Sequence, residues 1–109
     1  MIDRDGAACV WCGREHWPQD LTVEHLLPRG RGGSGSDENV AVACRGCNRR
    51  RGSRPAVAFV REELACGREP AIERLALALE RLGGSPVRAE AQYGRRQRAL
   101  LRRLGAASR

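Results

Sequence analysis

The chain has 109 residues, which is enough for one domain or for a small core with a helical appendage. Only 4% of the residues are aromatic, so a core built from alanine, leucine and valine is thin and calls for a further source of stability. The formal charge is +7 and every basic residue is an arginine, which favours a polyanionic partner such as nucleic acid. No segment approaches the roughly 20 apolar residues of a membrane span, and the polar N-terminus has no apolar signal core. A cytoplasmic protein that does not contact a membrane is therefore expected.

Two short strands are predicted in the first half of the chain. Residues 21–25 alternate and contain β-branched side chains, and Pro28 ends this strand. Residues 29–36 contain too many glycines for regular structure. Residues 39–44 form the second strand, and residues 47–51 form a turn or a helix that stops at a glycine.

Three helices are predicted in the second half. The first covers residues 55–66 and begins with a proline, which suits the first helical position, and Gly67 is its left-handed cap. The second, over residues 70–82, has the apolar stripe of a helix that faces a core. The third spans residues 87–104, is weakened by Gly94 and is dense in arginine.

Two Cys-x-x-Cys pairs predict a metal site. Its ligands are Cys9, Cys12, Cys44 and Cys47. Four thiolates at tetrahedral spacing give a closed structural zinc site, with disulfides or a redox pair as the alternatives. Bound zinc would bring the net charge to about +5. The two pairs are separated by more than the ~15–20 residues of a plain zinc ribbon, so a segment with its own role is inserted between them.

Two further residues have metal-binding side chains. Cys66 lies near the end of a predicted helix and is expected to be a small buried residue. His16 follows the first Cys pair and is expected at the surface or in packing contacts, with a role as a zinc ligand as the alternative.

The segment around and between the Cys pairs carries a second pattern. Glu24 and His25 end the first predicted strand, a proline and a Gly-Gly loop follow, and Asn39 opens the second strand. Asn48 comes directly after the last cysteine. Over residues 9–55 this order resembles the His-Asn-His (HNH) endonuclease family in a His-Asn-Asn form. The acidic position is commonly aspartate in that family, and here it is a glutamate.

The fold expected from this resemblance is small α+β. It consists of a ββα-metal nuclease core with a structural four-Cys zinc over residues 1–54. A helical C-terminal extension of about three helices follows over residues 55–109, packed on the core or appended to it, and this half carries no resemblance to the family.

The resemblance also implies roles for single residues. Neutral His25 is the general base that takes a proton from water, and Glu24 and Asn48 ligate a catalytic Mg²⁺ or Mn²⁺. Asn39 hydrogen-bonds the loop backbone and holds the imidazole in place. Because neighbouring residues of a strand point to opposite faces, a bend or bulge near His25 is predicted if Glu24 is to share its site.

Five arginines near this segment are candidates for binding the nucleic-acid backbone. They are Arg29, Arg31, Arg45, Arg49 and Arg50. A solvated basic surface is the alternative. The sequence leaves open whether the arginines of the last helix form a second DNA contact, a tail ordered on DNA or part of a dimer, and it leaves the oligomeric state open.

The function expected is that of a divalent-metal-dependent DNA endonuclease leaving 5′-phosphate and 3′-hydroxyl ends, with double-stranded DNA as the expected substrate. The main alternative is a catalytically inactive, zinc-dependent nucleic-acid-binding module, and a protein-interaction domain is the third possibility. The feature that separates them is Glu24-His25 together with Asn48, since a binding module has no need of a metal ligand beside a base.

Overall fold

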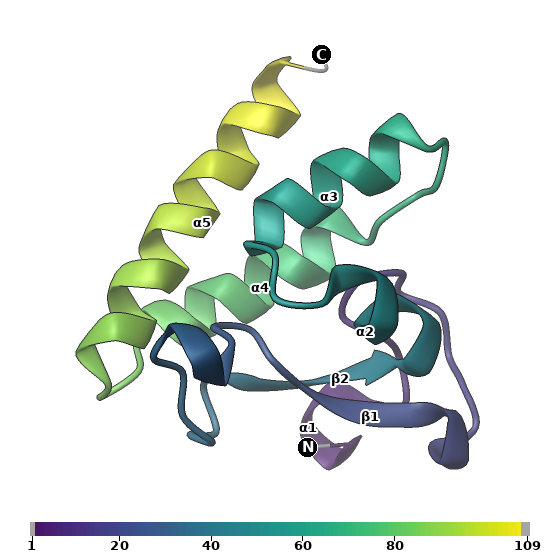
Figure 1. Ribbon diagram of the computed structural model, residues 1–109, viewed down its shortest axis with the longest axis horizontal. Helices are drawn as coiled ribbons and strands as arrows, with labels where there is room; N and C mark the ends of the chain where they lie inside the picture. The colour runs from purple at the N-terminus through teal and green to yellow at the C-terminus, as the bar shows by residue number, and fades with distance from the viewer. Residues whose placement is uncertain (1, 108–109) are drawn as a thin grey trace.

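The computed structural model describes residues 2–107 and contains a two-stranded sheet covered by helices (Figure 1). In chain order the elements are α1 (Ile2–Asp5), η1 (Pro18–Asp20), β1 (Leu21–His25), η2 (Arg29–Arg31), β2 (Val40–Cys44), α2 (Arg45–Arg51), α3 (Ala56–Ala65), α4 (Ile72–Gly83) and α5 (Arg88–Ala107). This is the small α+β fold that the sequence predicts. Among the described residues, no helix has the length and apolar character needed to cross a membrane.

The strands β1 and β2 form an antiparallel hairpin, and α2 continues directly from β2 and packs against it (Figure 1). Pairing is regular, with Leu21 opposite Cys44 and His25 opposite Val40. Side chains of a strand alternate between its two faces. Accordingly Val23 is 47% exposed, whereas the neighbouring Glu24 is 5% exposed and faces the interior. The hairpin and α2 together make a ββα unit.

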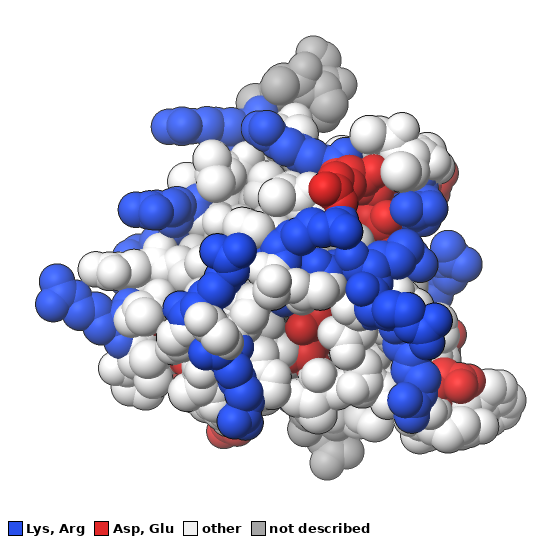
Figure 2. Space-filling view, in the orientation of Figure 1, with Lys and Arg blue, Asp and Glu red and all other residues white. Residues whose placement is uncertain are grey.

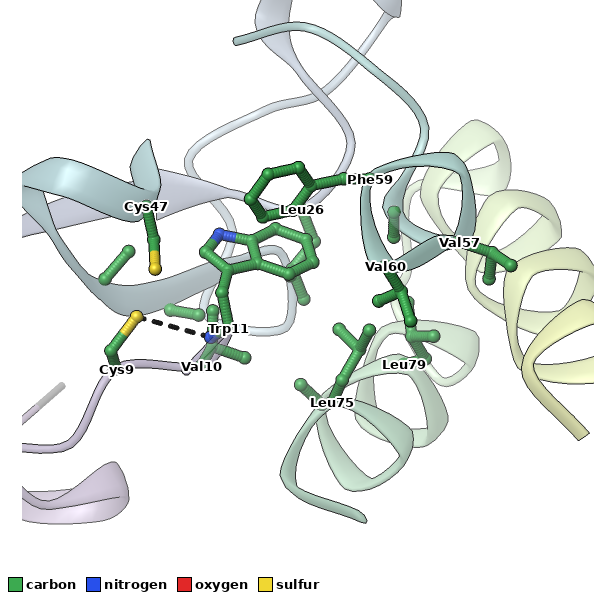
Figure 3. Close-up of a cluster of buried hydrophobic side chains, with 14 of the residues drawn as sticks. Cys9, Val10, Trp11, Leu26, Cys47, Val57, Phe59, Val60, Leu75 and Leu79 are labelled. Carbon is green, nitrogen blue, oxygen red and sulfur yellow. Dashed lines mark hydrogen bonds between the residues drawn. The ribbon is translucent and has the colours of Figure 1, made fainter. Parts of the chain in front are cut away.

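One hydrophobic cluster joins the cysteine-bearing half to the helices (Figure 3). Its centre is Trp11, which is 2% exposed and meets Phe59 of α3 edge to face, with ring centroids 5.3 Å apart. Leu75 and Leu79 of α4 belong to the same cluster. A buried tryptophan contributes a large apolar area, so Trp11 and Phe59 lie where they stabilise the fold, whereas Trp17 is 73% exposed.

The predicted helices of the second half are present, with boundaries shifted by a few residues at most. Gly67 has the expected positive φ, +79°, after the end of α3. The expectation that Cys66 is buried is wrong: its side chain is exposed. It is the C-cap of α3, and the segment from Cys66 to Glu69 is exposed to solvent as a whole.

Gly94 has a packing role that its helix propensity does not reveal. It lies where α5 crosses α4, and a Cβ there would come 2.6 Å from the Gly83 nitrogen and 2.9 Å from the Leu79 carbonyl oxygen. Both atoms belong to backbone, which cannot move aside as a flexible side chain can. The glycine therefore allows the close contact between the two helices.

Replacing Gly94 by alanine is expected to destabilise the protein by about 1–3 kcal/mol, because overpacking outweighs the better helix propensity. The free energy of unfolding in urea measures this. Gly105→Ala on the same helix is the matched control, since a Cβ there meets no atom within 4 Å. Equal stability of the two variants would contradict the packing role.

Candidate functional site

The four cysteines of the two pairs converge. Their Sγ atoms all lie within 4.8 Å of one another, and no other group of three or more His, Cys, Asp or Glu side chains within residues 2–107 is placed to hold a metal. The Cys9 sulfur accepts hydrogen bonds from the Trp11 and Cys12 N–H groups at 3.3 and 3.5 Å. The Cys44 sulfur accepts one from Cys47 at 3.4 Å. Hydrogen bonds from the Cys47 thiol and from the backbone of Cys12, Cys44 and Trp11 lower the pKa of Cys9 to about 4 against the effect of burial, which favours the thiolate form that binds a metal. This donor set fits a tetrahedral zinc ion.

Arg50 connects the second Cys pair to α3. Its Nη2 donates to the Cys47 sulfur at 3.4 Å and to the buried carboxylate of Glu63 at 2.8 Å. Burial raises the pKa of Glu63, but the hydrogen bonds from Arg50 and Arg68 hold it below its usual value. One side of the Arg50 guanidinium is therefore engaged within the protein.

Beside the first pair, the His16 Nε2 lies 3.8 Å from the Cys12 sulfur.

Glu24 points into the interior. Its Oε2 accepts a hydrogen bond from the Trp11 indole at 2.9 Å, and its Oε1 lies 3.3 Å from the Arg51 Nη1. Burial raises the pKa of Glu24, while Arg51 and Trp11 oppose that rise. The predicted bend occurs at residues 26–27, after the strand, and β1 itself contains no bulge.

His25 is half-buried at the end of β1. Its Nε2 accepts a hydrogen bond from the Arg29 Nε at 3.3 Å. Partial burial and the charge of Arg29 lower the pKa of His25, and the charge of Glu90 only partly opposes them. The imidazole is therefore predominantly neutral at pH 7, which is the form a general base requires.

Asn39 is fully buried and binds the backbone that follows His25. Its Oδ1 accepts from the Leu27 N–H at 2.8 Å, and its Nδ2 donates to the carbonyls of Leu27 and Ser34 at 3.1 and 2.8 Å. A Cβ on Gly33 would come within 1.7 Å of the Leu27 oxygen, so only glycine fits there. The side-chain amide of Asn39 thus joins Leu27, which precedes the glycine-rich loop of residues 29–36, to Ser34 within that loop.

Arg51 is the central residue that sequence reasoning missed. It is fully buried, and its guanidinium lies over Trp11, 5.1 Å from the ring centroid. All five of its N–H groups have acceptors, namely the carbonyls of Arg54, His25 and Leu26, the carboxylate of Glu24 and the hydroxyl of Tyr93. The one available signal was that three consecutive arginines, 49–51, cannot all face solvent on one side of a helix.

Asn48 lies on α2 directly after a cysteine of the metal cluster and is half-buried. Within residues 2–107 its side-chain amide makes no hydrogen bond, so its oxygen is available. Because α2 packs against β1, Asn48 and Glu24 come from neighbouring elements.

The five candidate nucleic-acid-binding arginines are all exposed. Arg31 donates to the Ser53 carbonyl at 3.0 Å, Arg45 donates to the Gln19 carbonyl at 3.1 Å, and Arg49 has no partner among the described residues. Figure 2 shows arginines spread over the face that carries α2, η2 and α5, with few acidic side chains between them. A face of this kind attracts a polyanion.

Comparisons with known proteins agree with this geometry. The family model of the HNH endonucleases matches residues 9–64. The CRISPR-associated endonuclease Cas9 of Corynebacterium diphtheriae is 29% identical over 55 residues, which are 50% of this chain and 5% of that protein. The crystal structure of the Type II-C Cas9 enzyme from Actinomyces naeslundii shares the fold, with a TM-score of 0.57 and 21% identity over 93% of this chain and 10% of that one. The chain thus spans only a small part of either relative. Since the family model covers more than half of its residues, the chain belongs to the HNH endonuclease family.

Proposed function

We propose that this protein is a divalent-metal-dependent DNA endonuclease in which His25 is the general base. The observation that carries the proposal is the position of His25: its half-buried imidazole ends β1 in a member of a family of endonucleases, and its neighbouring backbone is held by Arg51 and Asn39. A base of this kind takes the proton from the water that attacks the scissile phosphate.

The position of Arg29 fits this role. Its hydrogen bond to the His25 Nε2 is long, at 3.3 Å, and both side chains are accessible from solvent. A phosphate that approaches Arg29 offers its guanidinium a charged acceptor, which is a stronger partner than a neutral imidazole. Turning to the phosphate frees the Nε2 lone pair to accept the proton of water.

Glu24 and Asn48 are the proposed ligands of the catalytic cation. Each Glu24 oxygen accepts one hydrogen bond, which leaves acceptor capacity on both, and the Asn48 oxygen is available. Carboxylate and amide oxygens are donors that suit Mg²⁺ or Mn²⁺. A cation at this position would neutralise charge on the scissile phosphate and the leaving oxygen. Cys9, Cys12, Cys44 and Cys47 would hold a separate structural zinc.

Exposed arginines support DNA as the substrate. Four of them lie in the chain shortly after β1 or within α2: Arg29, Arg31, Arg45 and Arg49. Contacts from these side chains to the DNA backbone would give affinity without reading the base sequence. We infer double-stranded DNA with 5′-phosphate and 3′-hydroxyl products.

Plasmid nicking tests the proposal. With Mg²⁺ or Mn²⁺ the wild type should nick supercoiled DNA, and His25→Ala should lower the rate by about 10²–10⁴-fold because general-base catalysis is lost. DNA affinity and the circular dichroism spectrum of His25→Ala should match the wild type, and a chelator that leaves zinc bound should stop the wild type. If the wild type is folded and binds DNA but does not nick it in the presence of Mg²⁺ or of Mn²⁺, an enzymatic function is refuted.

One observation favours a second candidate, a catalytically inactive nucleic-acid-binding module. The Glu24 carboxylate is already paired with Arg51 and Trp11, so it is satisfied without a cation. The same nicking assay separates the two functions.

A further inference from the structure

A buried carboxylate on α5 lies outside the residues that the family model matches. Glu90 is 0% exposed, in the first turn of this helix. It accepts four hydrogen bonds, from the Ser34 N–H at 2.6 Å and from the hydroxyls of Ser34, Ser36 and Ser85 at 2.6, 2.6 and 2.7 Å. Three of the four come from the glycine-rich loop that follows η2.

Glu90 makes no ion pair with any described residue, so these four donors are what compensates its burial. Burying a charge is costly unless hydrogen bonds replace water. Burial raises the pKa of Glu90, yet the serine donors hold it below its usual value, and the side chain is ionised at neutral pH. Hydrogen bonds to a charged acceptor are stronger than those between neutral groups, so the loop is held firmly against α5.

The loop segment that Glu90 holds is the one that contacts Asn39. The Ser34 carbonyl accepts from the Asn39 Nδ2 at 2.8 Å, and the Ser36 carbonyl accepts from the Asn39 N–H at 3.0 Å. Asn39 in turn accepts from the Leu27 N–H through its side chain and from the Leu26 N–H through its backbone. A continuous chain of hydrogen bonds therefore runs from α5 to the backbone directly after His25.

We propose that Glu90 is a positioning residue of the nuclease site: by binding Ser34 and Ser36 it orders the glycine-rich loop against Asn39, and so sets the placement of His25. This rests on the proposed function. It makes α5 a working part of the site instead of an appended helix.

Glu90→Ala tests the inference. Nicking under saturating DNA should slow by about 10- to 100-fold, the range found when partners that orient active-site groups are removed, while KM changes less than about twofold. Glu90→Gln should restore most of the rate, because its amide oxygen can accept from Ser34 and its NH₂ can donate to the serine hydroxyls. The amides of Leu27 and Ser34 should exchange hydrogen faster in Glu90→Ala than in the wild type.

Gln97→Ala is the matched control. Gln97 is equally a buried polar residue of α5, but its one side-chain hydrogen bond within residues 2–107, from the Val57 N–H at 2.9 Å, is made away from the loop. It should lose stability and keep its rate. An equal fall in rate for Gln97→Ala and Glu90→Ala would overturn the inference, as would a folded Glu90→Ala with the wild-type rate.

If Glu90→Ala does not fold, the double variant Ser34→Ala/Ser36→Ala addresses the loop side of the same contacts. Its rate should fall to a similar extent, and an unchanged rate overturns the inference. The two proposals remain distinguishable: an inactive wild type refutes the nuclease function and this inference with it, whereas an active wild type with an equally active Glu90→Ala refutes only the role of Glu90.

Discussion

Cys44→Ser is expected to lose zinc and to unfold the domain. Cys44 ends β2 and caps α2, so its sulfur joins the hairpin to the helix on which Asn48 lies. Apparent binding energies of structural zinc, about 10–16 kcal/mol, match or exceed the 5–15 kcal/mol stability of an ordinary domain. Zinc content by atomic spectroscopy and folding by circular dichroism measure the outcome. Chelation of zinc from the wild type should have the same effect.

Cys66→Ser is the control for this substitution. It makes the same chemical change at an exposed cysteine outside the metal cluster, so zinc content and stability should remain those of the wild type. A soluble, folded and zinc-free Cys44→Ser protein would contradict the role of zinc in folding.

Arg51→Met is expected to cost about 3–5 kcal/mol of stability. The substitution keeps an unbranched side chain but removes five hydrogen bonds, and it leaves the buried charge of Glu24 without its cation. The carbonyls of His25 and Leu26 also lose their donor, so nicking should slow in any protein that remains folded. Urea unfolding measures the loss of stability. Arg51→Lys should recover little, since an ammonium cannot reproduce the planar array of five donors.

Arg49→Met provides the comparison, because Arg49 is exposed on the same helix and its replacement should change stability by less than about 0.5 kcal/mol. The double variant Glu24→Leu/Arg51→Met should be less destabilised than the sum of its single changes, since it removes both charges together. An Arg51→Met protein as stable as Arg49→Met would show that the buried ion pair does not stabilise the fold.

Local features of the fold could be read from the sequence. The alternation of side chains predicted β1, and the place of Gly67 after a helix predicted its positive φ. The matched spacing of the two Cys pairs predicted that the four cysteines lie together. The strand and the glycine cap depend on residues that are close in the chain, and the cysteine cluster depends on two identical Cys-x-x-Cys motifs. Periodicity and spacing in the sequence are therefore enough to predict them.

Sequence patterns predicted only part of the candidate site. Alternation implied that Glu24 and His25 point to opposite faces within a regular strand, and the bend predicted near His25 follows directly after β1, at residues 26–27. Whether Glu24 is a metal ligand or the partner of a buried arginine depends on what lies beneath the hairpin. The identity of Arg51 as that partner was hidden in a run of three arginines with no local difference between them.

The sequence by itself determined the two strands, the two matched pairs of cysteines and the residue types from which a nuclease site can be built. Only the tertiary structure decided which polar side chains are buried with partners and which face solvent. Ser34 and Glu90 are 56 residues apart in the chain, and Arg51 and Tyr93 are 42 apart. Their contacts arise from the packing of α5 against the rest of the fold. Gly94 permits that packing because it has no Cβ to collide with the backbone of α4. Hydrogen bonds of this range leave no periodic signal, because each needs one partner of the right chemistry at one place in space.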